Sequence, residues 1–161
     1  MTPKSLLRSD AAVSTTEDFT KGQFHEILEG PKPADVSKVE RLILCSGKVY
    51  YDLLAYREKN GWNDRSALVR LEQIYPLNEE ELRRITSPYA KAKEVVWCQE
   101  EPANMGSWHH LLPILMTFFR KAISYAGREA SASTAVGTTA AHKHQQAELI
   151  AQAFGEKVSE K

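Results

Sequence analysis

The sequence predicts an α/β fold, in which an open, mostly parallel sheet carries helices on both faces. Residues 42–45 form a short, unbroken apolar run rich in branched side chains, which is typical of a strand covered on both sides. Directly after this run the spacing changes, because Val49, Leu53 and Tyr56 fall on one helical face. Strand-like and helical patterns then alternate to the end of the chain, which favours parallel strands joined by crossover helices.

Two more strands and a well-marked helix follow this opening unit. Residues 67–71 and 94–98 are the second and third predicted strands. The helix between them begins at a clear signal, since Asn78 is a good N-cap and Glu81 stands three residues later, as in a capping box. The serine–proline pair at residues 87–88 ends that helix, because a residue before proline disfavours helical backbone.

The last part of the domain repeats the pattern once more. Ser107 is predicted to cap a helix that runs to about Lys121, in which Pro113 is unfavourable unless the helix begins near Leu112. Residues 123–126 are a fourth predicted strand, closed by a glycine. The expected sheet therefore has about four strands.

A small, polar segment precedes the final helix. Residues 128–139 are rich in Ala, Ser, Thr and Gly, so they form a loop or lie close against other backbone. From Ala140 the spacing is helical again, with Ile150 and Phe154 on one face and Gly155 at the end.

The first 38 residues predict no core of their own. We interpret residues 1–38 as an arm and linker that lead from a preceding domain, residues 39–155 as the α/β domain, and residues 156–161 as a tail. Within the arm, the capping-box spacing of Ser14 and Glu17 predicts a short helix from Thr15 to about residue 20.

Charge and hydropathy narrow the partners and the compartment. The 161 residues carry 21 Lys plus Arg and 21 Asp plus Glu, so the formal net charge of zero favours neither nucleic acid nor an acidic membrane surface as a partner. The longest apolar run, residues 111–119, is too short to span a bilayer, and no signal peptide opens the chain. Cys45 and Cys98 lie in apolar strand-like runs, which predicts free, buried thiols.

Two places near the carboxyl ends of predicted strands could carry chemistry. Ser46, Gly47 and Lys48 stand where a strand meets a helix N-terminus, a place that attracts anions. The segment matches no nucleotide-binding motif, however, and a plain turn is the commoner explanation. Glu100 and Glu101 could act in acid–base chemistry, but salt bridges to basic residues such as Arg70 or Arg128 are the commoner arrangement.

Neither a metal centre nor a catalytic nucleophile is predicted. The neighbouring histidines His109 and His110 diverge on a helix, as do His142 and His144, and no pair of cysteines has the spacing of metal ligands. No nucleophile signature is present. We therefore assign no catalytic, cofactor-binding or metal-binding residue.

Five blocks of sequence, in order, resemble a known family. They are MTPKSLLR, LCSGKVYYDL, VRLEQIYPL, WCQEEPANMGSW and YAGREASASTAVG. Together they resemble the carboxyl-terminal end of the thiamine-diphosphate-dependent first component of the 2-oxoglutarate dehydrogenase complex, from Met1 to about Gly155. Met105 departs from the glutamine that the family usually has at that place, and residues 111–124 fall in a region that varies widely in the family.

The resemblance implies a transketolase C-terminal-type domain and a fragment of a much longer enzyme. That enzyme would oxidatively decarboxylate 2-oxoglutarate and pass the succinyl group to a lipoyl group, as a step of the tricarboxylic acid cycle. Its thiamine diphosphate and Mg²⁺ would be held by domains absent from this chain, so the chain alone is expected to be inactive. The expected partners are the upstream domains, a second copy in a homodimer and the lipoyl-bearing succinyltransferase component.

The resemblance also implies regulation by acidic effectors, such as acetyl-CoA or adenine nucleotides. The candidate effector-binding residues are Arg8, Lys48, Gln99 and Arg128. Salt bridges with Glu100 and Glu101 at a dimer interface are the other explanation of these basic residues.

The resemblance allows two compartments, two substrates and one alternative function. The expected compartment is the cytoplasm of a bacterium, which we prefer, or the mitochondrial matrix of a eukaryote. The pattern does not separate 2-oxoglutarate from 2-oxoadipate as the substrate. The alternative function is a stand-alone α/β module that binds a CoA- or nucleotide-type ligand.

Overall fold

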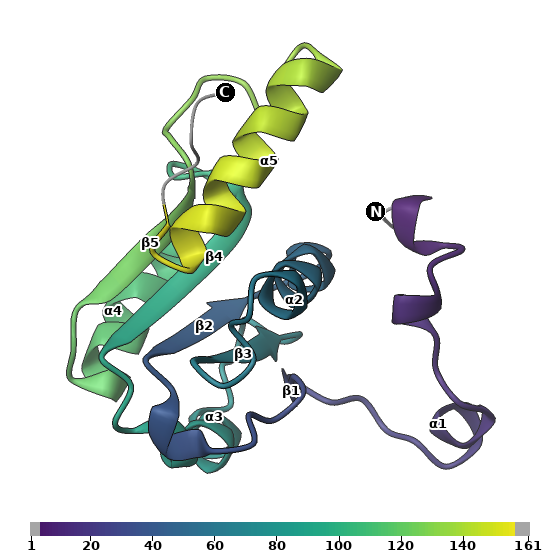
Figure 1. Ribbon diagram of the computed structural model, residues 1–161, viewed down its shortest axis with the longest axis vertical. Helices are drawn as coiled ribbons and strands as arrows, with labels where there is room; N and C mark the ends of the chain where they lie inside the picture. Colours follow the sequence, from purple (N-terminus) through teal and green to yellow (C-terminus); the bar gives the residue numbers. More distant parts are fainter. Residues whose placement is uncertain (1–3, 157–161) are drawn as a thin grey trace.

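Five strands form the central sheet of the computed structural model, which describes residues 4–156 (Figure 1). Strand β2 lies between β3 and β4 and is parallel to both, and β5 is parallel to β4. Only β1 is antiparallel, at the edge next to β3. The order is β1-β3-β2-β4-β5, with bounds Ile27–Glu29, Arg41–Cys45, Ser66–Leu71, Glu94–Pro102 and Ile123–Arg128. The predicted open, mostly parallel sheet is confirmed.

Helices cover both faces of the sheet, as predicted. Alternate side chains of β2 point to opposite sides, so that Leu42 and Leu44 join one core and Ile43 and Cys45 the other. The first core is closed by α3 (Glu79–Thr86) and α4 (Trp108–Phe119), and the second by α2 (Val49–Lys59) and α5 (Thr139–Ala153). The arrangement explains why the strand sequences are apolar on both faces.

The prediction of about four strands was wrong by one. Residues Ile27–Glu29 of the predicted arm form β1, which pairs with Val69–Leu71 in β3 and buries Ile27. A three-residue strand is too short to show a period in the sequence, and its pairing is decided by the edge that β3 offers. The boundary placed at residue 39 stays a prediction.

Several predicted element ends differ from the structure. Strand β4 continues to Pro102, so Gln99 and Glu100 lie within the strand and not after it. Helix α4 begins at Trp108, keeps Pro113 inside, and receives no side-chain cap from Ser107. The short helix α1 (Thr16–Thr20) is capped by Thr15 with Asp18, one residue later than the predicted pair Ser14 and Glu17.

Short helical turns and the arm complete the described chain. The turns are η1 (Lys4–Leu6), η2 (Asp10–Ala12), η3 (Val36–Lys38) and η4 (Ser87–Tyr89). None of residues 4–25 is buried, and the arm leaves the body of the domain on the side of β1 (Figure 1). Most of the predicted tail, residues 157–161, lies outside the described residues, as do residues 1–3 of the arm.

Both thiols are free and buried, as predicted. Burial raises the pKa of Cys45 to about 12 and that of Cys98 well above its ordinary value. Among residues 4–156, no helix is both long and apolar enough to cross a membrane.

Candidate functional site at the carboxyl edge of the sheet

The carboxyl ends of β2, β4 and β5 bring three predicted or possible site residues together. Lys48 follows β2, Glu100 lies near the end of β4 and Arg128 ends β5. These ends share one edge because the three strands are parallel, and ligands of open α/β sheets gather at this edge. This edge is therefore the candidate functional site.

Lys48 is held between two carboxylates. Its Nζ lies 2.8 Å from Oε1 of Glu100 and 3.0 Å from Oδ2 of Asp52, one helical turn further on in α2. Partial burial lowers the pKa of Lys48, but the hydrogen bonds to Glu100 and Asp52 outweigh burial and raise the pKa above its ordinary value. Lys48 is therefore positively charged, and its charge is already balanced by the two carboxylates. The predicted alternative for Glu100, a salt bridge to a basic residue, is what the structure shows, although with Lys48 and not with Arg70 or Arg128.

Arg128 is tied to the same edge through α5. Its guanidinium donates to the backbone carbonyl of Glu100 and, over 2.9 Å, to Oε1 of Gln146, while Nδ1 of His142 lies 3.3 Å away. Gln146 in turn donates to Oδ2 of Asp52 over 2.9 Å. Lys48 and Arg128 are thus linked by way of Glu100 and by way of Asp52 and Gln146.

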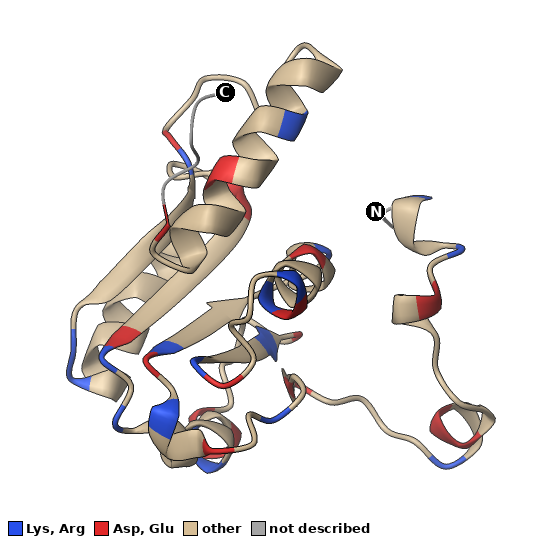
Figure 2. Cartoon of the chain, viewed as in Figure 1, with Lys and Arg blue, Asp and Glu red and all other residues tan. Residues whose placement is uncertain are grey.

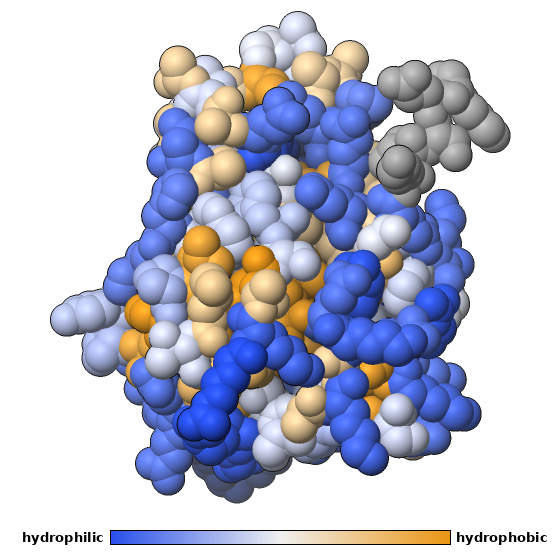
Figure 3. All heavy atoms as spheres, turned by 90° about the vertical axis from the view of Figure 1, so that its left-hand side faces the viewer, coloured by the Kyte–Doolittle hydropathy of each residue, from blue (hydrophilic) through white to orange (hydrophobic). Residues whose placement is uncertain are grey.

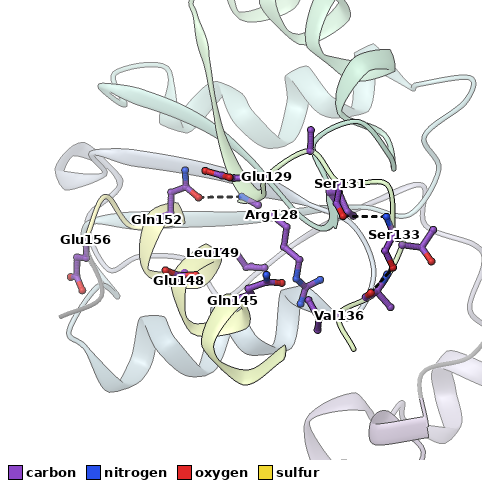
Figure 4. A pocket seen from close by; sticks show the side chains of 15 residues that line it. Arg128, Glu129, Ser131, Ser133, Val136, Gln145, Glu148, Leu149, Gln152 and Glu156 are labelled. Carbon is purple, nitrogen blue, oxygen red and sulfur yellow. Dashed lines mark hydrogen bonds between the residues drawn. The ribbon is translucent and has the colours of Figure 1, made fainter. Parts of the chain in front are cut away.

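A cavity of about 760 Å³ lies beside Arg128, between residues 129–136 and α5 (Figure 4). Two of the side chains that line it have buried polar atoms without a hydrogen-bond partner among the described residues, Nε of Arg128 and Oε1 of Gln145. A second hollow of about 380 Å³ is lined by Arg128, His142 and residues 134–139. Arg128 is therefore shared by both hollows.

The cavity offers both a cation and hydrogen-bonding groups. An N–H of Arg128 can donate to an anion, and the amide oxygen of Gln145 can accept from a ligand hydroxyl or amine. Carboxylates of Glu129, Glu148 and Glu156 also line the wall, so the positive end is local to Arg128. The arrangement suits a polar ligand with one anionic group near Arg128.

Gln99 faces away from this cavity. Strand alternation places it on the α4 side of the sheet, whereas Glu100 faces α2 and α5. It is buried, its Oε1 accepts from Trp97 Nε1 and from the backbone N–H of Trp108, and its Nε2 donates to three carbonyls, those of Glu101, Pro102 and Met105. Gln99 therefore joins the end of β4 to the start of α4.

The remaining candidate, Arg8, lies in the arm. It is exposed and does not line the cavities described above. Of the four predicted effector residues, the structure therefore brings Lys48 and Arg128 together and separates Gln99 and Arg8 from them.

Sequence reasoning missed Asp52, His142 and Gln146. Asp52 had a usable signal, because a lysine and an aspartate four residues apart can pair on a helix. Gln146 had none, since its bond to Asp52 joins residues 94 positions apart. Among residues 4–156, no group of three or more His, Cys, Asp or Glu side chains could hold a metal ion.

The fold is that of an open α/β domain of the transketolase C-terminal type. It matches a solved structure described as "Split gene transketolase, inactive beta4 tetramer" with a TM-score of 0.52 over 71% of this chain and 37% of that one. The sequence identity is 13%, so this likeness concerns the fold alone.

The chain belongs to the 2-oxoglutarate dehydrogenase C-terminal family, whose model matches residues 13–154. It is 50% identical over 159 residues to a 2-oxoglutarate dehydrogenase E1 component of Azotobacter vinelandii and 46% identical over 157 residues to that of Cupriavidus necator. Each alignment covers 96% of this chain but only 17% and 16% of the relative. The chain therefore spans about a sixth of the length of these relatives.

Proposed function

We propose that this chain acts as the carboxyl-terminal domain of a 2-oxoglutarate dehydrogenase first component and is not catalytic by itself. The observation that carries the proposal is the match over nearly the whole chain to one end-domain family, in relatives about six times longer. In the complete enzyme, this domain would support the dimer and the surroundings of the active site. The substrate would be 2-oxoglutarate, and the succinyl group would pass to a lipoyl group in the tricarboxylic acid cycle.

Thiamine diphosphate and Mg²⁺ would be held elsewhere in the complete enzyme. The described residues hold no cluster of metal ligands, and the sequence holds no GDG-type diphosphate motif, so the residues present do not fit these groups. We derive no step of the reaction from this chain. Its proposed partners are the upstream domains, a second copy and the lipoyl-bearing succinyltransferase component, and the bacterial relatives favour the bacterial cytoplasm.

Reconstitution tests the proposed role of the domain. The 161 residues alone should give no 2-oxoglutarate-dependent reduction of an artificial acceptor, and addition of the upstream chain should restore this activity together with a dimeric mass in light scattering. Loss of activity when this chain is omitted from the mixture is the matched control. A stable monomer that changes neither the activity nor the mass of the upstream chain would contradict the proposal and favour a stand-alone binding module.

The cavity beside Arg128 is our proposed effector site. The free Nε of Arg128 and the unpartnered Oε1 of Gln145 support a ligand that has both an anionic group and a hydrogen-bond donor, as adenine nucleotides and acetyl-CoA have. Lys48 stands at the same edge but is neutralised by two carboxylates, so its contribution is smaller. Gln99 and Arg8 do not line this cavity, and their part in effector binding stays a prediction.

Titration with acetyl-CoA and with AMP tests the effector site. Arg128→Met should weaken binding about tenfold or more, because it removes a charge-assisted hydrogen bond. Arg120→Met, which changes an exposed arginine at the end of α4, is the matched control and should leave the affinity unchanged. Equal affinities for both variants would place the effector elsewhere and would leave the proposed domain role standing.

A further inference from the structure

The outer arm, residues 4–24, exposes large apolar side chains that the domain does not cover. Leu7, Val13, Phe19 and Phe24 are exposed by 69%, 74%, 80% and 67%. They are four of the seven large apolar side chains that are exposed among residues 4–156, although the outer arm is a small part of that range. Apolar side chains gathered in one short segment mark a contact surface, whereas single ones scattered over a protein need no explanation.

The outer arm has a shape of its own. Helix α1 begins with a capping box, in which Thr15 Oγ1 accepts from the N–H of Asp18 over 3.2 Å and Asp18 Oδ2 accepts from the N–H of Thr15 over 2.7 Å. Nζ of Lys21 lies 2.9 Å from Oε1 of Glu17. After the helix, a Cβ at Gly22 would clash with the carbonyl oxygen of Asp18. A featureless spacer needs none of these contacts, so α1 is built to hold a conformation.

The outer arm is rooted in the domain at Glu26. The backbone carbonyl of Glu26 accepts from the N–H groups of Glu72 and Gln73 over 2.8 and 3.0 Å, and its carboxylate accepts from Gln73 and Asn78. Beyond this root, every hydrogen bond that residues 4–24 make among the described residues stays within the segment. Figure 1 shows the outer arm lying apart from the sheet and its helices. Its apolar side chains are therefore free to pack against something outside residues 4–156.

The charges of the outer arm favour an apolar partner surface. Two of its acids are already used within the segment, Glu17 by Lys21 and Asp18 by Thr15. Three basic and three acidic side chains give the segment a net charge of zero: Lys4, Arg8 and Lys21, with Asp10, Glu17 and Asp18. Figure 2 shows both colours along the arm. A strongly charged partner would gain little from this segment, so the contact depends on the four apolar side chains.

In the relatives, most of the enzyme lies beyond the outer arm. The family model begins at residue 13, so α1, Phe19 and Phe24 belong to the carboxyl-terminal segment of the family. This chain covers only 17% of the Azotobacter vinelandii relative, and a carboxyl-terminal segment has the rest of the enzyme before it. The outer arm comes first in this segment, so the upstream domains are the large partner closest to it along the chain.

We propose that the outer arm docks on the upstream domains and is more than a spacer. Phe19 and Phe24 would enter an apolar hollow there, and Leu7 and Val13 would cover apolar surface beside it. The inference rests on the proposed domain role, and it names the surface by which this domain is held to the upstream chain.

Binding of this chain to a separately produced upstream chain, measured by titration calorimetry, tests the docking. Phe19→Ala should weaken binding about tenfold or more, because it removes a large apolar contact. Phe19→Leu keeps an apolar side chain and should weaken binding less. Tyr75→Ala is the matched control, since Tyr75 is also 80% exposed but lies in the body of the domain, between β3 and α3. This control should leave the affinity unchanged, and circular dichroism checks that all variants stay folded.

Hydrogen exchange gives a readout that does not depend on activity. In the isolated chain the backbone amides of residues 4–24 should exchange fast, and a saturating upstream chain should slow those of residues 15–24 about tenfold or more. Slow exchange in the isolated chain at low concentration would mean that the outer arm packs on its own domain. Slow exchange that appears only when this chain alone is concentrated would mean that two copies associate. Either result would overturn the docking.

The outcomes separate the docking from the proposed domain role. If the wild-type chain binds the upstream chain and the double variant Phe19→Ala, Phe24→Ala binds it equally well, the docking is overturned and the domain role stands. Absence of any binding by the wild-type chain would overturn the docking and the domain role together.

Discussion

At the scale of single residues, Gln99 shows how one side chain organises a junction. It satisfies two N–H donors and three carbonyls where β4 gives way to the loop before α4. Gly106 completes the junction: its φ of 66° suits glycine, and a Cβ there would lie 2.9 Å from Nε2 of Gln99. The glutamine and the glycine therefore depend on each other.

Removal of the Gln99 amide should be costly. Gln99→Leu leaves the buried Trp97 Nε1 and the N–H of Trp108 without acceptors, and we expect the free energy of unfolding to fall by about 2–4 kcal/mol. Urea denaturation measures the change. Gln23→Leu, at an exposed glutamine of the arm, is the control and should change stability by less than about 0.5 kcal/mol. Equal losses for both variants would contradict the role of Gln99.

The two thiols should be unreactive in the folded protein. Burial raises the pKa of Cys45 to about 12, and that of Cys98 is also raised, so almost no thiolate is present at pH 8. We expect iodoacetamide to label neither residue in the native state and both in urea, as mass spectrometry would show. Rapid native labelling of either thiol would mean that the sheet opens locally.

At the scale of elements, α4 begins at Trp108, directly after Ser107 as predicted, and not near Leu112. Its exposed side carries Pro113 in the sixth position, and only Leu111 and Leu115 are buried. Met116 remains 45% exposed. On the face drawn in Figure 3, apolar side chains gather in the middle and polar ones surround them. Packing of two leucines on β4 and β5 thus holds a helix that its proline disfavours.

Replacement of this proline should stabilise the domain. Pro113→Ala supplies the missing N–H without loss of buried surface, because the ring is exposed. The greater freedom of alanine in the unfolded chain offsets about 0.5–1 kcal/mol of the gain. We expect a net increase of about 1–2 kcal/mol in urea denaturation. His109→Ala, also exposed in α4, is the control and should have a smaller effect. A decrease for Pro113→Ala would mean that the proline itself stabilises the helix.

At the scale of the whole molecule, protons bound by buried groups link stability to alkaline pH. Burial raises the pKa of Cys45 and of Tyr125 to about 12, and burial together with the bond to Glu156 raises that of Tyr56 to about 12. The unfolded chain loses these protons first, between about pH 9 and 10. These groups therefore stabilise the folded protein below about pH 9, and this contribution is lost as the pH rises toward 12.

Stability should accordingly fall above pH 9. We expect urea midpoints that change little between pH 7 and 8.5 and decline steadily at higher pH, with no such decline caused by added salt alone. A chain with Cys45→Ala and Cys98→Ala should lose the part of the decline that begins near pH 9. A midpoint that rises with alkaline pH would contradict the assigned directions of these pKa values.

Local patterns in the sequence determined much of this fold. Short apolar runs predicted β2 to β5, and the Asn78 cap predicted α3, whose Oδ1 accepts from the N–H of Glu81. These features depend on neighbours within one or two helical turns, so they are legible without a fold. The ordered blocks of the carboxyl-terminal end also indicated the family, and the match over residues 13–154 confirms it.

The tertiary structure decided what depends on distant partners. Strand β1 exists because β3 offers a free edge, and β4 runs on to Pro102 through an irregularity in its pairing with β5. The same holds for the candidate site. Successive side chains of a strand point to opposite faces, so Gln99 and Glu100 lie on different sides of the sheet. Sequence alone thus determined the fold class and the family. The site, by contrast, was decided by strand register and by contacts between distant residues, such as that of Arg128 with Gln146. Such contacts depend on packing, which no local pattern records.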